Sequence, residues 1–388
     1  MARIIVSGYM VRHPLAGNLM AYFHYVYGLW LLGHEVFYLE ESGWPSSCYN
    51  PGTHAYGDDP GAGLQALQTL MAECGIDVPV CYVDRDSGAV FGTPWDDAKR
   101  SLSAADLLLN LGGTCWLPEF RLCHRRVFID MDPLFTQAGL FTMAPLDEYR
   151  ALFSYGANIG RSGCTIPTGG VDWLPLVPPV VPELWQRRPA VIAAREETGK
   201  PANDAFTTVA NWHAYGGITY RGEHYGQKDE EFLRLVDLPR HTAQRLELAL
   251  SGIESAPLER LRAAGWSIRN GGDISKDIPA YQAYIVGSRG EFSVAKHAYV
   301  KTHSGWFSDR SVCYLAAGLP VIVQDTGFSD WLPVRRGVLP FHSLAEAVEC
   351  IEQVNADYLA HRQAAREIAV GTFSHSAVLS RLLDTAMR

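Results

Sequence analysis

Short apolar runs alternate with longer amphipathic segments along the first half of the chain. The run Arg3–Ser7 (RIIVS) predicts a buried strand, and a loop rich in small and polar residues follows it. Asn18–Leu32 has the apolar spacing of a helix, and Gly33 stands where a helix C-terminal cap belongs. This order of strand, loop, helix and strand is the opening of a doubly wound parallel sheet. Further strands are predicted at 35–41 (EVFYLEE), at 105–110 (ADLLLN), at 126–131 (RVFIDM) and from Phe153 onward, the last of this half.

A proline-rich run at 173–190 (WLPLVPPVVPELWQRRPA) separates this series from a second one. Repeated prolines exclude a helix or a central strand, so the run is predicted to be a stiff connector. The alternating pattern then resumes. It predicts strands at 206–210, 245–251 and 266–269, helices at 229–235 and 258–264, and an apolar run at 283–287 that leads toward a loop at residue 303.

Two such series predict an α/β protein with two Rossmann-like, doubly wound parallel sheets that face a cleft. The carboxyl ends of both sheets open onto that cleft, where folds of this kind bind ligands. A chain of 388 residues is also long for a single hydrophobic core, which favours two domains. We expect a first domain over residues 1–175, a linker over 176–200, a second domain over 201–372 and a C-terminal helix within 373–388.

Composition narrows the classes of function. The chain has 47% hydrophobic and 19% charged residues, the balance of an ordinary globular protein. Its formal net charge of −9 argues against nucleic acid as a partner, because proteins that bind nucleic acid usually carry a basic face. We see no signal peptide and no apolar segment of membrane-spanning length, so we expect a cytoplasmic protein. The eight cysteines form no C-x-x-C pair, so reduced core thiols are expected.

The segment 303–327 (HSGWFSDRSVCYLAAGLPVIVQDTG) carries the clearest candidate site. A helix that begins near Ser308 would present unpaired backbone N–H groups and a partial positive charge to an anion. Gly305 would let the anion approach the backbone closely, and Arg310 would add positive charge. The alternative is that Ser308 or Asp309 only caps the helix. The candidate anion-site residues are His303, Ser304, Gly305, Trp306, Phe307, Ser308, Asp309 and Arg310.

This segment resembles the nucleotide-sugar site of GT-B glycosyltransferases. In that family a His-Cys-Gly-x-x-Ser type loop at a helix N-terminus holds the donor diphosphate, and the helix ends in Ala-x-Gly-x-Pro-Val. The chain has HSGWFS at 303–308 and AAGLPV at 316–321. GLWLLGHEV at 28–36 and FIDMDPLFTQ at 128–137 are similar to passages in the first domain of such enzymes. The resemblance implies that the first domain takes the acceptor, that the second takes the nucleotide sugar, and that the C-terminal helix crosses back to the first domain.

It further implies transfer of a sugar from a nucleoside-diphosphate donor to an acceptor hydroxyl, with no metal and no cofactor beyond the co-substrate. A small-molecule or glycan acceptor and a bacterial natural-product or polysaccharide pathway are implied in the same way. Plant-type relatives, however, keep Asn and Glu where Phe307 and Ser311 stand, and the retaining branch keeps two Glu where Gly305 and Cys313 stand. The ribose contact and the stereochemistry are therefore left open.

The turn Gln324-Asp325-Thr326-Gly327 follows the predicted strand at the cleft edge. The resemblance implies that this turn contacts the sugar, and the Asp325 carboxylate can accept hydrogen bonds from two sugar hydroxyls. The alternative is a plain polar turn closed by Gly327.

Three further residues complete the candidate donor site. Trp212 lies in the loop NWHAYGG, whose two glycines suit a flexible contact with diphosphate or acceptor, and Lys228 follows that loop. A solvated surface lysine is the alternative for Lys228. Ile274 follows Asn270-Gly271-Gly272-Asp273, where GT-B folds receive the nucleobase, and a plain glycine turn is the alternative there.

Catalysis needs a base that deprotonates the acceptor hydroxyl if the reaction inverts, or a polarising environment if it retains. His13 occupies the region where inverting GT-B enzymes keep a histidine, and Asp132 can either orient that histidine or act itself. A surface histidine is the alternative for His13, and Asp130, within the strand, is interpreted as structural. No His, Asp or Glu cluster has the regular spacing of metal ligands, so no metal site is predicted.

Three other classes of protein fit the sequence less well. A nucleotide-sugar epimerase of the same fold needs carboxylates around 303–327, where the chain has few. A non-catalytic, periplasmic-type ligand-binding protein needs a signal peptide, which the N-terminus does not show. A Rossmann dehydrogenase needs G-x-G-x-x-G after the first strand, and GYMVRHPLAGN at 8–18 does not supply it.

Overall fold

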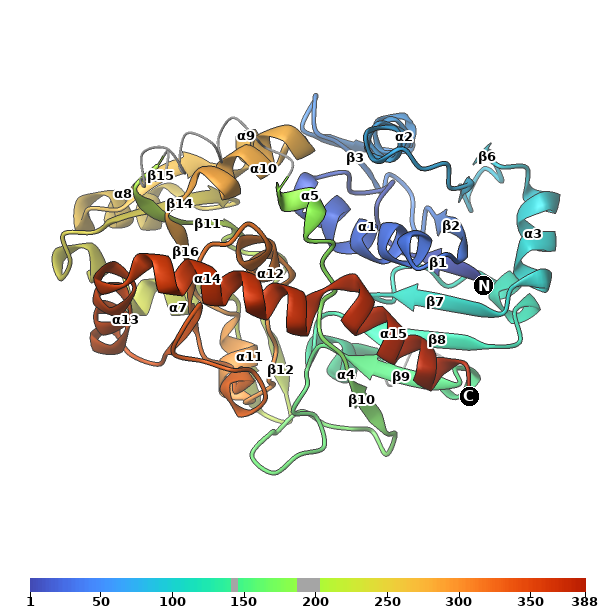
Figure 1. Ribbon diagram of the computed structural model, residues 1–388. Helices are drawn as coiled ribbons and strands as arrows, with labels where there is room; N and C mark the ends of the chain where they lie inside the picture. Colours follow the sequence, from blue (N-terminus) through green and yellow to red (C-terminus); the bar gives the residue numbers. More distant parts are fainter. Residues whose placement is uncertain (141–145, 187–202) are drawn as a thin grey trace.

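The computed structural model describes residues 1–140, 146–186 and 203–388, and within these ranges it contains two large sheets flanked by helices (Figure 1). The strands of the first sheet are β1 (Arg3–Ser7), β2 (Glu35–Glu41), β5 (Val80–Val83), β6 (Val90–Gly92), β7 (Leu107–Leu111), β8 (Arg126–Asp130), β9 (Ala151–Ser154) and β10 (Trp173–Pro175). They lie in the order β10-β9-β8-β7-β1-β2-β5-β6. All neighbours are parallel except β6, which runs antiparallel to β5 at the edge.

The second sheet is parallel throughout. Its strands are β11 (Ala205–Asn211), β14 (Arg245–Ser251), β15 (Ser267–Asn270), β16 (Gly290–Ser293), β17 (Val321–Gln324) and β18 (Val338–Phe341). Their order, β15-β14-β11-β16-β17-β18, reverses direction next to β11, as that of the first sheet does next to β1. Ligands of such folds bind outside the carboxyl ends of the strands at this reversal. The predicted α/β class with two doubly wound parallel sheets is confirmed.

Helices and two short hairpins complete the described chain. The helices of the first half are α1 (Ala16–Leu31), α2 (Gly61–Cys74), α3 (Trp95–Ala104), α4 (Phe135–Leu140) and α5 (Glu183–Gln186). Those of the second half are α7 (Lys228–Arg234), α8 (Ser255–Ala264), α9 (Gly271–Ser275), α10 (Ile278–Gly287), α11 (His297–Lys301), α12 (Asp309–Ala316), α13 (Leu344–Ala356), α14 (Tyr358–Ile368) and α15 (His375–Ala386). The hairpins pair β3 (Cys48–Asn50) with β4 (Ala55–Gly57), and β12 (Ile218–Tyr220) with β13 (Glu223–Tyr225). No helix in the described ranges is long and apolar enough to cross a membrane.

Several predicted strands have the boundaries that the structure gives them, namely β1, β2 and β14. Two other predictions are wrong. The strand at Phe153 is not the last of its sheet, because β10 adds one more at the edge, and a single turn of helix, α5, lies in the proline-rich run. The prolines forbid neither, because an edge strand and a first helical turn both tolerate a missing N–H group.

The residues before the loop at 303 are expected only to be apolar. The run 283–287 is the end of α10, and the strand that precedes the loop is the short β16. The plain turn considered as the alternative at 270–273 is not found. Helix α9 begins there, because the side chain of Asn270 accepts a hydrogen bond from the N–H of Gly272 and so caps the helix.

The C-terminal segment returns to the first domain. α14 and α15 run across the front of the molecule in Figure 1, from the second sheet to the first. α15 packs against α1, and Gly28 permits this contact, since a Cβ there would lie 2.7 Å from Cβ of His375. Val180 bridges Ser374 where the chain passes between the domains, and the predicted linker is described only as far as residue 186; its remainder lies outside the described residues.

The packing of α15 on α1 gives a first testable prediction. Leu379 of α15 is fully buried, so Leu379→Ala is expected to lower stability by about 2–5 kcal/mol through the cavity it leaves. The control is Leu359→Ala in α14, because the residue is 69% exposed and little apolar surface is lost. Thermal unfolding of both variants measures the difference, and equal melting temperatures would contradict the packing.

Candidate functional site

A cavity of about 270 Å³ opens between the two domains. The first domain contributes the loop after β1 and the start of α1, and the second contributes loops that follow β11, β14 and β16 and the first residues of α7 and α12. The cavity therefore lies at the carboxyl ends of both sheets, where the sequence predicts the cleft. The charged or polar residues of its wall include His13, Asn18, Lys228, Lys296, Asp309 and Arg310.

Lys228 is the most unusual cation of this wall. It is the first residue of α7 and forms no hydrogen bond or ion pair within the described part of the chain. Burial, together with the neighbouring cations Arg310 and Lys296, lowers the pKa of Lys228 to about 7. Because desolvation and like charges disfavour the ammonium form, an anion bound in the cavity would restore it.

Arg310 contributes positive charge to the wall, and three of its five N–H donors already bind groups of the second domain. Its Nε lies 2.6 Å from Oε1 of Glu291, its Nη2 donates to Oγ of Ser293 at 2.7 Å, and its Nη1 donates to the carbonyl oxygen of Val209 at 2.9 Å. Burial alone would lower the pKa of Arg310, but the Glu291 carboxylate outweighs it and raises the pKa above the ordinary value. The guanidinium therefore stays charged and fixed at the start of α12.

The loop that the sequence analysis assigns to an anion is contacted by the first domain. The side-chain Nδ2 of Asn158 donates to the carbonyl oxygens of Gly327 at 3.0 Å and His303 at 3.3 Å. The backbone N–H of Asn158 donates to the carbonyl oxygen of Ser304 at 3.0 Å. Gly305 has φ of 74°, and a Cβ there would lie 2.7 Å from Cγ of Asn158. The close approach that this glycine permits is to Asn158, and a phosphate contact at Gly305 stays a prediction.

Polar side chains of the candidate donor set are largely engaged within the second domain. The Ser308 hydroxyl caps α12 by accepting the N–H of Arg310 at 3.2 Å, which is the alternative considered for it. The Asp325 carboxylate accepts the N–H of Gly327 at 2.8 Å and so closes its own turn. Gln324 donates to Glu231 at 2.7 Å. Further side-chain bonds join Ser304 to the N–H of Trp306, Thr326 to the carbonyl oxygen of Trp306, and His303 to Asp330.

Aromatic members of the set are mostly packing residues. Trp212 is buried and stacks on Phe232, with ring centroids 5.8 Å apart, and Phe307 is buried against Phe373. Trp306 is half-buried beside Tyr299. Ile274, in α9, is half-buried against the largest apolar cluster, and its neighbour Ser275 lines the cavity.

His13 lies on the cavity wall of the first domain, in a loop held by Glu40. The Glu40 carboxylate accepts the backbone N–H groups of Met10, Val11 and Arg12, each at 2.8 Å, which fixes the loop that ends at His13. Nδ1 of His13 is buried and has no hydrogen-bond partner in the described chain. Burial lowers the pKa of His13, so its imidazole is neutral near pH 7 and can accept a proton.

Asp132 is the centre of an interdomain cluster. Nζ of Lys296 lies 2.9 and 2.8 Å from its two carboxylate oxygens, and the hydroxyls of Tyr215 and Tyr299 donate to it. Among the described residues Asp132 makes no hydrogen bond to His13. The structure therefore gives Asp132 a different set of partners from the orienting role that the sequence analysis considered.

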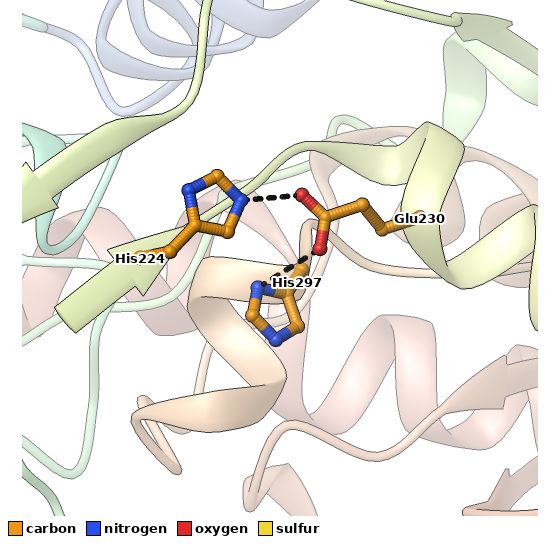
Figure 2. A group of neighbouring side chains, drawn as sticks. All are labelled: His224, Glu230 and His297. Carbon is orange, nitrogen blue, oxygen red and sulfur yellow. Dashed lines mark hydrogen bonds and ion pairs between the residues drawn. The ribbon is translucent and has the colours of Figure 1, made fainter.

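Sequence reasoning missed Lys296, Asn158 and Tyr215. Lys296 follows β16, and a correct assignment of that strand would have placed a lysine at the carboxyl edge of the sheet. Tyr215 lies in the loop NWHAYGG, for which the sequence analysis names Trp212 and the two glycines but not the tyrosine. Asn158 lies in a loop without a motif, so no signal in the sequence singles it out. One group of His and Glu side chains in the described chain also has the separation of metal ligands, namely His224, Glu230 and His297, and none of them lines the cavity (Figure 2).

Comparison with known proteins identifies the fold. No family model and no curated protein matches the sequence. An alpha-glucosyltransferase (AGT) solved with UDP matches over 100% of both chains, at 11% identity and a TM-score of 0.57. AviGT4, a glycosyltransferase involved in avilamycin A biosynthesis, is 14% identical with a TM-score of 0.53, over 100% of this chain and 98% of its own. The protein has the GT-B fold. HepE of Anabaena, solved with UDP and glucose, is 11% identical with a TM-score of 0.57 over 99% of both chains.

The similar structures also bear on nucleic acid as a partner. The alpha-glucosyltransferase has been solved with UDP-glucose and DNA, at 10% identity to this chain and a TM-score of 0.57 over 99% of both chains. A GT-B fold is thus compatible with a DNA ligand. The expectation that this chain binds no nucleic acid stays a prediction from its charge.

Proposed function

We propose that the protein transfers a sugar from a nucleoside-diphosphate donor to a hydroxyl of an acceptor. The observation that carries the proposal is the interdomain cavity. In it Lys228, which has no side-chain partner among the described residues, lies beside Lys296 and Arg310, and His13 stands on the wall of the other domain. A diphosphate brings concentrated negative charge, which such a group of cations stabilises. Similar GT-B structures hold UDP, so we take uracil as the first nucleobase to test.

The second domain would act on the leaving group. When the bond between the anomeric carbon and the diphosphate oxygen breaks, negative charge builds on the diphosphate. The Lys228 ammonium and the N–H groups at the start of α12 would stabilise this charge in a cavity of low dielectric. This electrostatic contribution would let transfer proceed without a bound metal, as the resemblance implies.

The first domain would bind the acceptor. The acceptor oxygen forms the new bond to the anomeric carbon, and its proton passes to the neutral His13. Three tyrosine rings surround that imidazole: Tyr9 at 5.6 Å between centroids, Tyr49 at 5.4 Å and Tyr56 at 6.4 Å. Tyr56 is 59% exposed, so its face is open to a sugar ring or a planar aglycone. A small-molecule or glycan acceptor, from natural-product or polysaccharide synthesis, fits these rings.

A ligand screen tests the proposal. UDP, GDP, dTDP and ADP are added separately to the full chain, and the melting temperature is followed. We expect UDP to raise it by a few degrees, because a ligand at about 100 times its Kd adds about 2.7 kcal/mol of stability. Uridine, which lacks the phosphates, serves as the control and should give a much smaller shift. If none of the four diphosphates stabilises the protein, the donor site is wrong.

A further inference from the structure

The side chains of two histidines and one glutamate come together in the second domain (Figure 2). His224 lies on β13, Glu230 in α7, and His297 is the first residue of α11. Nε2 of His224 is 2.7 Å from Oε1 of Glu230, and Nδ1 of His297 is 3.5 Å from Oε2 of the same carboxylate. The two rings stack with centroids 6.0 Å apart. Both imidazoles thus direct one nitrogen each at opposite oxygens of one carboxylate.

The protonation of His297 is set by the backbone. Its Nδ1 accepts the N–H of Gly226 at 3.1 Å, so this nitrogen carries no proton. An unprotonated nitrogen therefore faces a carboxylate oxygen at 3.5 Å with no hydrogen between them. A cation placed between them would bind both atoms. It would replace the N–H of Gly226 as the partner of the lone pair on Nδ1 of His297.

The group is held in place by contacts that do not involve the three side chains. The N–H of His297 donates to the carbonyl oxygen of Gln227, and that of Ala298 to the carbonyl oxygen of Gly226, both at 3.2 Å. Lys301 of α11 also donates to the carbonyl oxygen of His224 at 2.9 Å. These bonds fix α11 against the end of β13. The residues after β13 and those of α11 are therefore arranged before any ligand binds.

Gly226 is part of this arrangement. A Cβ at this position would lie 1.6 Å from Oε1 of Glu230, so any larger residue would displace the carboxylate from its present position. The group is also accessible, because the side chains of His224 and Glu230 are 58% and 33% exposed. A metal ion could enter from solvent and keep a water molecule as a further ligand.

From this geometry we infer that His224, Glu230 and His297 form a binding site for Zn²⁺. Two imidazole nitrogens and one carboxylate oxygen are a ligand set that suits zinc, with water in the fourth position, whereas Mg²⁺ prefers oxygen ligands. The site joins the β12–β13 hairpin to α7 and α11, so bound zinc stabilises this part of the second domain. The carboxylate and the imidazoles come from three elements, which explains why no regular spacing marks them in the sequence.

The test uses the full chain after treatment with a chelator and dialysis. Titration calorimetry with Zn²⁺ alone is expected to give one site per chain, and thermal unfolding is expected to show a rise of the melting temperature with zinc and none with Mg²⁺. His297→Ala and Glu230→Gln are each expected to weaken zinc binding at least about tenfold, since each removes a direct ligand. His241→Ala, which removes an exposed imidazole outside the group, is the matched control and should leave binding unchanged.

Two outcomes would overturn the inference. One is that the unaltered protein binds no zinc in a saturable way. The other is that His297→Ala and Glu230→Gln bind zinc as tightly as the unaltered protein, which would place the zinc outside this group. His224→Ala provides a second variant if the others unfold, because its exposed side chain is removed at little cost to packing. No nucleotide is present in these experiments, so their result is independent of the donor-site test.

Discussion

Replacing Lys228 with alanine is expected to weaken the binding of UDP by about 10–100-fold. A hydrogen bond to a charged group contributes about 1.5–3 kcal/mol, and each 1.4 kcal/mol corresponds to a tenfold change in Kd. Lys228 is the cation of the cavity wall that has no partner in the described chain, whereas Arg310 and Lys296 are paired with Glu291 and Asp132. Its charge is therefore the one most available to a diphosphate. Titration calorimetry with UDP measures the change.

The controls for this variant separate charge from folding. Lys99→Ala removes a lysine from α3 of the first domain, which pairs with Asp96 on the surface, and should leave the Kd for UDP unchanged. Lys228→Arg keeps a positive charge and is expected to retain part of the affinity, because guanidinium differs from ammonium in shape. An unchanged Kd in Lys228→Ala would remove this residue from the donor site.

Replacing His13 with alanine is expected to lower kcat by about 10²–10⁴-fold, the usual contribution of a general base. Binding of UDP should change little, because His13 belongs to the first domain and the proposed diphosphate contacts belong to the second. His124→Ala, an exposed histidine of the first domain, is the matched control and should keep full turnover. Turnover that survives in His13→Ala would exclude His13 as the base.

The pH dependence of the reaction gives a second readout for His13. Burial lowers the pKa of this imidazole, and a base works only while it is unprotonated. The acid limb of kcat/KM is therefore expected to lie below the ordinary histidine value of about 6.5. Activity should persist as the pH falls through that value and be lost only at lower pH. A midpoint above 6.5 would contradict the buried position of His13.

Interdomain contacts around Asp132 indicate how the cleft is held together. Lys296, Tyr215 and Tyr299 of the second domain all bind this carboxylate of the first domain. A second contact between the domains is the hydrogen bond from the side chain of Asn158 to the carbonyl oxygen of Gly327. A donor diphosphate in the cavity would compete with Asp132 for the Lys296 ammonium, which couples donor binding to the contact between the domains in the proposed mechanism.

The sequence by itself determined the architecture. Arg3–Ser7 and Arg245–Ser251 are strands of parallel sheets whose central residues are buried, so their length and their content of apolar residues suffice to find them. The order of strands and helices then fixes the parallel sheets and the position of their carboxyl ends. His13 and Lys228 could be predicted for the cleft because each follows a strand of this pattern.

Only the tertiary structure decided which side chains are available to a ligand. The sequence shows Gly305 as a place for a close approach, but the approaching group in the fold is Asn158, from a distant segment. In the same way Asp132 is paired with Lys296, and His224 meets Glu230 and His297. The local pattern of apolar and polar residues predicts a strand or a helix. It does not predict a contact between segments far apart in the chain, because such a contact depends on how whole sheets and loops pack.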